Sequence, residues 1–391
     1  MRSRRKFLMD SLFRLPIFIS VSMPGRLFAH IIPFSFFKKY VSLWGWGENG
    51  DGQVGNGTVV TVTTPTLIHG TSVWKGVACG SSFSMGLQEP GSLWTWGDNT
   101  YGQLGYGNTN NKSSPTQVGS VDTWSSVVAG VYHSVATKRD GTLWAWGANP
   151  NGALGQGNIA SKSAPVQIGT DTDWASCGPG YHATYAVKTD GTLWACGLND
   201  TGQLGMNDLT ARSTMTQIGA DTNWASVHGS LRFVVALKTN GTLWAWGLND
   251  RGALGINNTT NKSSPTQVGS ATTWSRIGIG RNHTIGVRAD GTLWTWGGNG
   301  SGQLGIGVTG DRTSPIQVGT ETYWRQGAGS LSTTFAVDVN GGLWGWGLNT
   351  SGEIGNGDST SKSSPVQVGT GKIWTEITAS YYSTNMMGLK K

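Results

Sequence analysis

A nearly identical phrase recurs every fifty residues along this chain of 391 residues. One copy, GTLWAWGLNDRGALG, runs from Gly241 to Gly255. The first tryptophan of each copy falls at Trp44, Trp94, Trp144, Trp194, Trp244, Trp294 and Trp344. Self-similarity at a period of about 50 residues indicates a body built from one repeated supersecondary unit rather than several independent globules.

The content of one unit predicts short β-strands. Asp140-Gly141 is a hairpin turn signal, and residues 142–146 follow as a strand whose two tryptophans share one face. Further short strands are expected at residues 165–168, 175–177 and 184–188. No stretch has helical periodicity. Four short strands repeated seven times predict an all-β fold, a seven-bladed β-propeller.

The two ends of the repeat region complement each other. Residues 41–46 read as the second strand of a hairpin whose first strand is missing. Residues 381–389 read as a first strand without its second. Pairing the two would close the ring and leave no open sheet edge. We therefore expect one domain over residues 41–391, closed by its N- and C-terminal strands.

The repeat resembles that of the regulator of chromosome condensation family. The resemblance rests on motifs such as WGDNTYGQLGYG from Trp96 and AGVYHSVA from Ala129, and it covers residues 41–391. It implies a seven-bladed propeller, in agreement with the repeat count. It also implies that His133 and His283 are structural residues that buttress their own blades.

Tryptophan and cysteine positions indicate how such a ring is held together. All 20 tryptophans fall at three positions of the repeat, which we call columns and which begin with Trp44, Trp46 and Trp74. The only unit without tryptophan in the second column has Cys196 there. Buried indoles at these columns would supply much of the apolar contact between units. The three cysteines, Cys79, Cys177 and Cys196, are expected to be buried thiols rather than a disulfide framework. No cofactor or metal motif is present, so neither is expected.

The charge distribution argues against a nucleic-acid partner. The formal net charge is +7, but residues 1–40 account for all of it, because residues 41–391 carry 20 basic and 20 acidic residues. A neutral body lacks the global positive field of a general phosphate-backbone binder.

The leader, residues 1–40, contains SRRKFL, which resembles a twin-arginine export signal. Its uncharged runs are shorter than a bilayer span, so contact with a membrane is expected only through an uncleaved leader. Export to the periplasm or outside the cell is the expectation. The alternatives are a membrane anchor, a disordered basic tail or a wrongly assigned start of the chain, and without export the protein would be cytoplasmic.

The turns that follow the glycine of the Gly-x-x-His motif vary while the rest of the repeat stays constant. In a propeller these seven turns lie at one end of the ring, where they can form a shared surface. Their aromatic, basic and amide residues are typical of binding hot spots. The candidate binding residues are Tyr132, His133, Tyr181, His182, Arg232, Phe233, Arg281, Asn282, His283, Tyr381 and Tyr382. Relaxed sequence drift at an exposed turn is the competing interpretation.

The sequence favours a non-catalytic, monomeric binding module whose partner is a protein or a glycan. No catalytic constellation recurs with defined spacing, so an enzyme is not expected. The alternative function is guanine nucleotide exchange with chromatin association, as in the founding member of the family. That activity relies on an insertion from one blade, which the strict fifty-residue spacing leaves no room for.

Overall fold

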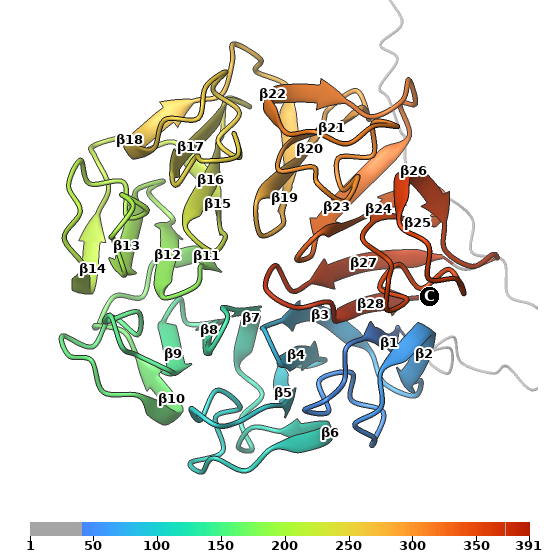
Figure 1. The fold of residues 1–391 in the computed structure, drawn as a ribbon. Helices are drawn as coiled ribbons and strands as arrows, with labels where there is room; N and C mark the ends of the chain where they lie inside the picture. Colours follow the sequence, from blue (N-terminus) through green and yellow to red (C-terminus); the bar gives the residue numbers. More distant parts are fainter. Residues whose placement is uncertain (1–40, 372) are drawn as a thin grey trace, which may run out of the picture. The chain divides into compact units, whose positions relative to one another are not determined.

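The computed structural model describes residues 41–371 and 373–391 as a seven-bladed β-propeller (Figure 1). The predicted leader, residues 1–40, lies outside the described residues. Each blade is a four-stranded antiparallel sheet, with its first strand next to the ring axis and its fourth strand at the rim. No helix in the described part of the chain is long and apolar enough to span a bilayer.

We number the blades along the chain. Blades 1–6 begin with β3, β7, β11, β15, β19 and β23, and blade 7 combines both ends of the propeller. The first strands are β3 (Trp74–Cys79), β7 (Trp124–Ala129), β11 (Trp174–Pro179), β15 (Trp224–Gly229), β19 (Trp274–Ile279), β23 (Trp324–Gly329) and β27 (Trp374–Ala379). The second strands are β4 (Phe83–Gln88), β8 (His133–Lys138), β12 (Ala183–Lys188), β16 (Phe233–Lys238), β20 (His283–Arg288), β24 (Thr333–Asp338) and β28 (Met386–Lys390).

The outer half of each blade begins at the repeated LW pair. The third strands are β5 (Ser92–Gly97), β9 (Leu143–Gly147), β13 (Leu193–Gly197), β17 (Leu243–Gly247), β21 (Leu293–Gly297), β25 (Leu343–Gly347) and β1 (Ser42–Gly47). The fourth strands are β6 (Lys112–Gln117), β10 (Lys162–Gln167), β14 (Arg212–Gln217), β18 (Lys262–Gln267), β22 (Arg312–Gln317), β26 (Lys362–Gln367) and β2 (Val62–His69). The fourth strand starts earlier than predicted, at Lys162 instead of Pro165, because an irregular ladder accommodates the proline inside an edge strand.

Blade 7 closes the ring as predicted. Its strand order is β2-β1-β28-β27, so the N-terminal pair joins the C-terminal pair in one sheet. Ser42 lies opposite Lys390, and Trp46 lies opposite Met386, in an unbroken antiparallel register. The partial blades at the two ends of the propeller therefore complete one another, and neither β1 nor β28 presents an open edge.

Indole rings join neighbouring blades. Trp96 in blade 1 is fully buried, and its Nε1 donates to the carbonyl oxygen of Gln53 in blade 7 at 2.9 Å. The equivalent bond from Trp146 to Gln103 is also 2.9 Å. In blade 3 the thiol of Cys196 takes this place, 3.4 Å from the carbonyl oxygen of Ala153. This backbone-directed link between adjacent blades is made by five tryptophans, Trp96, Trp146, Trp246, Trp296 and Trp346. The indole Nε1 of Trp46 in blade 7 is buried without such a bond.

Candidate interaction surface at one end of the ring

The variable turns and the long loops share one end of the ring, which we call the turn end. The first strand of a blade leads to a variable turn, and the antiparallel third strand returns the chain to the same end. Main-chain bonds join the two segments. Ala148 donates to the carbonyl oxygen of Tyr132 at 2.9 Å, and Leu198 donates to that of His182 at 2.7 Å.

Neighbouring variable turns are hydrogen-bonded to each other. The amide of Tyr181 donates to the carbonyl oxygen of Ser230 at 3.1 Å, and the amide of Arg281 donates to that of Ser330 at 3.2 Å. The hydroxyl of Ser230 donates to the carbonyl oxygen of Gly280 at 2.7 Å. Because turns on adjacent blades are linked in this way, the turn end presents side chains on a preorganised base.

Four of the candidate binding residues are buried and face the propeller body instead of the turn end. They are His133, Phe233, His283 and Tyr381. The Nε2 atoms of the two histidines lie 3.1 Å and 2.8 Å from threonine hydroxyls of the next blade, Thr184 and Thr334. The histidines are structural as the resemblance implied, but they brace the neighbouring blade. Burial lowers the pKa of both to about 3, so they stay neutral.

The remaining aromatic candidates gather into one group. The aromatic patch consists of Tyr101, Tyr132, Tyr181, His182 and Tyr382, contributed by blades 1, 2, 3 and 7. Tyr132 lies at its centre, with ring centroids 6.1 Å from Tyr181 and 6.3 Å from Tyr382. Tyr181 of blade 3 and Tyr382 of blade 7 stack at 5.8 Å with an interplanar angle of 21°. Blades that are distant in the ring therefore meet through these side chains.

Basic and amide candidates lie beside the aromatic patch. The Arg281 guanidinium is 5.6 Å from the ring centroid of Tyr382, within cation–π range. Arg232 forms an ion pair of 3.3 Å with Asp200, and its side chain remains 42% exposed. Asn282 is half-buried in the same turn as Arg281. The structure therefore brings seven of the eleven candidates to the turn end.

Three members of the aromatic patch, Tyr132, Tyr181 and His182, are neutral near pH 7. Burial, with nearby Tyr382 and Tyr181, raises the pKa of Tyr132 to about 12, and burial also raises the pKa of Tyr181. Burial lowers the pKa of His182 to about 4, so its imidazole is neutral. An aromatic surface flanked by arginines is the composition typical of protein-binding hot spots.

Tyr101 was missed by the sequence analysis. It lies in the loop after β5, is 47% exposed, and its ring centroid is 5.5 Å from that of Tyr132. The surface expected from the sequence comprised the variable turns alone. The return of the third strand to the same end places the β5–β6 loop beside them, and this pairing of turn and loop could have identified Tyr101.

The ring axis contains a cavity of about 270 Å³ lined by the first strands. Cys79, Cys177, His228 and Glu376 contribute to its wall. Burial raises the pKa of both thiols to about 12, so they are protonated and poor nucleophiles at neutral pH. Among residues 41–371 and 373–391, no group of three or more His, Cys, Asp or Glu side chains is arranged to hold a metal ion.

Solved structures with the same fold include human WBSCR16, with a TM-score of 0.81 and 19% identity over 90% of this chain and 99% of that chain. Yeast RCC1 (Prp20) bound to Kap60 aligns with a TM-score of 0.80 and 18% identity, over 90% of this chain and 89% of that chain. Prp20p from Saccharomyces cerevisiae, in a structure reported with its binding properties to Gsp1p and histones, gives 0.78 and 18%, over 90% and 92%.

A search of curated protein sequences gives no match. Family models match most of the propeller. The RCC1-like domain matches residues 43–332, and the regulator of chromosome condensation (RCC1) repeat matches residues 340–385. These matches agree with the seven-bladed geometry and with the motifs in each blade. The chain belongs to the RCC1-like repeat family.

Proposed function

We propose that this propeller is a non-catalytic protein-binding module that recognises its partner through the aromatic patch at the turn end. The observation that carries the proposal is the stacking of Tyr181 on Tyr382 beside Tyr132, which joins side chains of three blades into one surface. Large, rigid aromatic rings supply contact area at low conformational cost. Arg232 and Arg281 supply hydrogen-bond donors at the edge.

The fold is compatible with this proposal, since a structural relative, yeast RCC1 (Prp20), was crystallised bound to Kap60. A protein partner is favoured over a glycan because the patch combines aromatic side chains from four blades and its base is fixed by turn-to-turn hydrogen bonds. The buried thiols and neutral buried histidines offer no activated nucleophile or general base, which supports a non-catalytic role.

The test of this proposal is quantitative partner binding by single variants of the patch. The partner would be isolated by cross-linking to the full chain in its native host, and its affinity would then be measured with purified protein. Tyr132→Ala and Tyr382→Ala should each weaken binding by about 30-fold or more, because loss of a hot-spot aromatic costs about 2 kcal/mol. Arg232→Ala should weaken it less, because Arg232 is exposed and already paired with Asp200.

The matched control lies at the other end of the ring. Val339 is 60% exposed in the turn after β24, and Val339→Ala should leave the affinity unchanged. Phe233→Ala is unsuitable as a surface variant, because Phe233 is 3% exposed and its truncation would create a core cavity. Equal affinity for wild type and for both tyrosine variants would refute the turn-end proposal.

We also propose that the propeller acts after export. The SRRKFL motif in residues 1–40 supports this, and the three cysteines, which are free thiols, fit a route that carries folded proteins without disulfides. Fractionation of the native host with N-terminal sequencing should recover a mature chain that starts near Ala29 outside the cytoplasm. Recovery of an intact chain from the cytosol would contradict export.

A further inference from the structure

Five blades place a basic side chain over a pair of tryptophans. The pair consists of the tryptophan that begins the first strand and the first tryptophan of the third strand. In blade 4, Lys238 Nζ lies 4.6 Å and 4.0 Å from the ring centroids of Trp224 and Trp244. The five basic residues, which lie at or near the end of the second strand, are Lys138, Lys188, Lys238, Arg288 and Lys390.

In two of these blades a carboxylate completes the arrangement. Lys188 Nζ lies 2.7 Å from Asp171 Oδ2 in blade 3, and Lys238 Nζ lies 2.7 Å from Asp221 Oδ2 in blade 4. The ammonium group therefore sits between two indole faces and a carboxylate from the loop that precedes the first strand. This combination is favourable for an ammonium ion, because ring quadrupoles and an anion act on it together. We call it the ammonium box.

Blade 6 keeps the tryptophan pair and an acidic residue at the carboxylate position, but it has no lysine. The carboxylate of Glu321 accepts a hydrogen bond from the amide of Thr320 at 3.0 Å and lines the same cavity as the two tryptophans. Trp324 and Trp344 form the pair, with ring centroids 5.9 Å apart. Glu321 occupies the repeat position of Asp171 and Asp221, at the fifty-residue spacing. Asp338 stands where the lysine would be. Across residues 41–371 and 373–391, no Lys or Arg side chain lies over Trp324 or Trp344.

Asp338 is tied to the structure by local hydrogen bonds. Its carboxylate accepts from Nε1 of Trp344 at 3.0 Å and from the amide of Gly342 at 2.9 Å. In blade 5 the equivalent tryptophan, Trp294, donates instead to the hydroxyl of Thr292 at 2.9 Å. Blade 6 thus differs from blade 5 at two linked positions, where Asp338 and Gly342 replace the equivalents of Arg288 and Thr292. The carboxylate replaces the missing threonine hydroxyl, and in doing so removes the basic side chain from the box.

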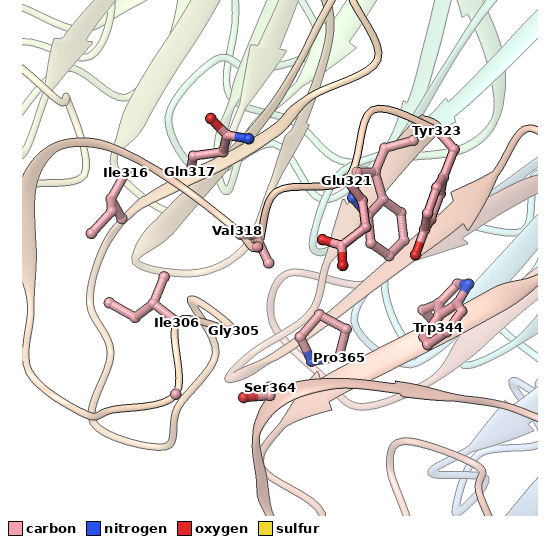
Figure 2. Close-up of a pocket in the computed structure, with 13 residues that line it drawn as sticks. Gly305, Ile306, Ile316, Gln317, Val318, Glu321, Tyr323, Trp344, Ser364 and Pro365 are labelled. Atoms are coloured by element: carbon pink, nitrogen blue, oxygen red, sulfur yellow. The ribbon is translucent and has the colours of Figure 1, made fainter.

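A cavity of about 470 Å³ opens at this box, between blades 5 and 6. Figure 2 shows Glu321, Tyr323, Trp344 and Pro365 around the same opening. Tyr323 adds a third aromatic ring, 5.2 Å from Trp324. Burial raises the pKa of Tyr323, and the nearby negative charges of Glu321 and Asp338 raise it further. Arg325, which follows Trp324 in β23, donates its Nη2 to the carbonyl oxygen of Trp374 at 2.8 Å.

We propose that this cavity binds a primary alkylammonium group, which takes the position that Lys188 and Lys238 occupy in their own blades. The indole faces of Trp324 and Trp344 would contact the ammonium and its methylene stem, and Glu321 would balance its charge. Tyr323 widens the aromatic wall. The site lies away from the aromatic patch, so the proposal does not depend on the function proposed for the turn end.

Titration of the full chain with n-butylammonium, followed by ligand-observed NMR, tests the site directly. Binding in the millimolar range is expected for so small a probe, and n-butanol, which has no charge, should not bind. Glu321→Gln should weaken the affinity about fivefold, the effect of one partly exposed charge pair. Asp221→Asn removes the same carboxylate from the filled box of blade 4 and should leave the affinity unchanged.

The decisive variant rebuilds the filled box in blade 6. Asp338→Lys with Gly342→Thr gives this blade the lysine and hydroxyl found in blade 4, so the protein's own ammonium should occupy the site and abolish binding of n-butylammonium. The fold should persist, with melting temperature as the check. Unchanged binding in this double variant, or in Glu321→Gln, would overturn the proposal. Absence of butylammonium binding to wild type would overturn it as well.

Two sources of the ammonium group can be separated with the same assay. N-acetyl-lysine methylamide presents it as a peptide side chain, and n-butylammonium presents it as a free amine. Tighter binding of the lysine derivative, with none by N-acetyl-norleucine methylamide, would identify a lysine of a protein ligand. Tighter binding of the free amine would identify a small amine.

Discussion

At the scale of single residues, a residue that differs from its equivalents in the other blades can be recognised from the sequence alone. Cys196 could be located from the sequence, because every other blade has tryptophan at that position, and the structure confirms that it is fully buried. Glu376 could not be located in this way. Its position in β27 reads as an ordinary polar residue, and only closure of the ring places its carboxyl in the wall of the axial cavity.

Glu376 predicts a pH-dependent stability. Burial raises the pKa of its carboxyl from 4.5 to about 7. The folded state therefore retains a proton that the unfolded state releases between pH 4.5 and 7, so this group's contribution to the free energy of unfolding falls as pH rises through that window. Relative to Glu376→Gln, wild type should lose about 1–3 kcal/mol between pH 5 and pH 8, because one pKa unit corresponds to about 1.4 kcal/mol.

Denaturant unfolding of wild type and Glu376→Gln at several pH values measures this effect. The difference between the two proteins isolates Glu376 from His228, whose pKa is lowered to about 4 by burial and whose contribution to stability is lost instead on acidification below pH 6.5. Parallel curves for the two proteins from pH 5 to pH 8 would show that the carboxyl is not desolvated.

At the scale of strands and turns, periodicity predicted more than side-chain chemistry did. The alternation of apolar residues and the Asp-Gly turns located the second and third strands closely, because a hairpin register follows from both signals together. The fourth strand was placed three residues late, since Pro165 was taken as its start and the structure extends it back to Lys162. An edge strand tolerates an internal proline where the ladder is irregular.

In the candidate site, the sequence located the turns correctly but did not fix the directions of their side chains. The variable turns were correctly assigned to one end of the ring, but position in a turn does not determine whether a side chain points outward. In blades 1–6 the third residue of the turn already begins the second strand, so Phe233 and His283 turn into the core. The exchange of Asp338 and Gly342 was visible in the sequence. Its meaning required the distances that show where lysines lie in the other blades.

At the scale of the whole molecule, closure by β1 and β28 determines how the chain can be cut. Leu389 pairs with Leu43 across the closing ladder, just as Thr137 pairs with Leu143 in blade 2. Blade 2 connects these two residues through Lys138 and an Asp-Gly turn. The junction in blade 7 therefore has the geometry of an ordinary hairpin whose connection is open, and new termini at another polar loop should be tolerated.

A circular permutant tests this equivalence. Lys390 would be joined to Ser42 through Thr-Asp-Gly, which reproduces the five-residue connection of blade 2, and the new termini would be placed in the exposed loop between β10 and β11. The permutant should fold with a melting temperature within a few degrees of the propeller formed by residues 41–391.

Deletion of residues 380–391 should instead prevent folding or lower the melting temperature sharply. The deletion exposes the edges of β1 and β27 and removes the buried side chains of Met386, Met387 and Leu389. A deletion variant as stable as the permutant would mean that the closing strand contributes nothing, and that the ring is held by contacts between blades alone.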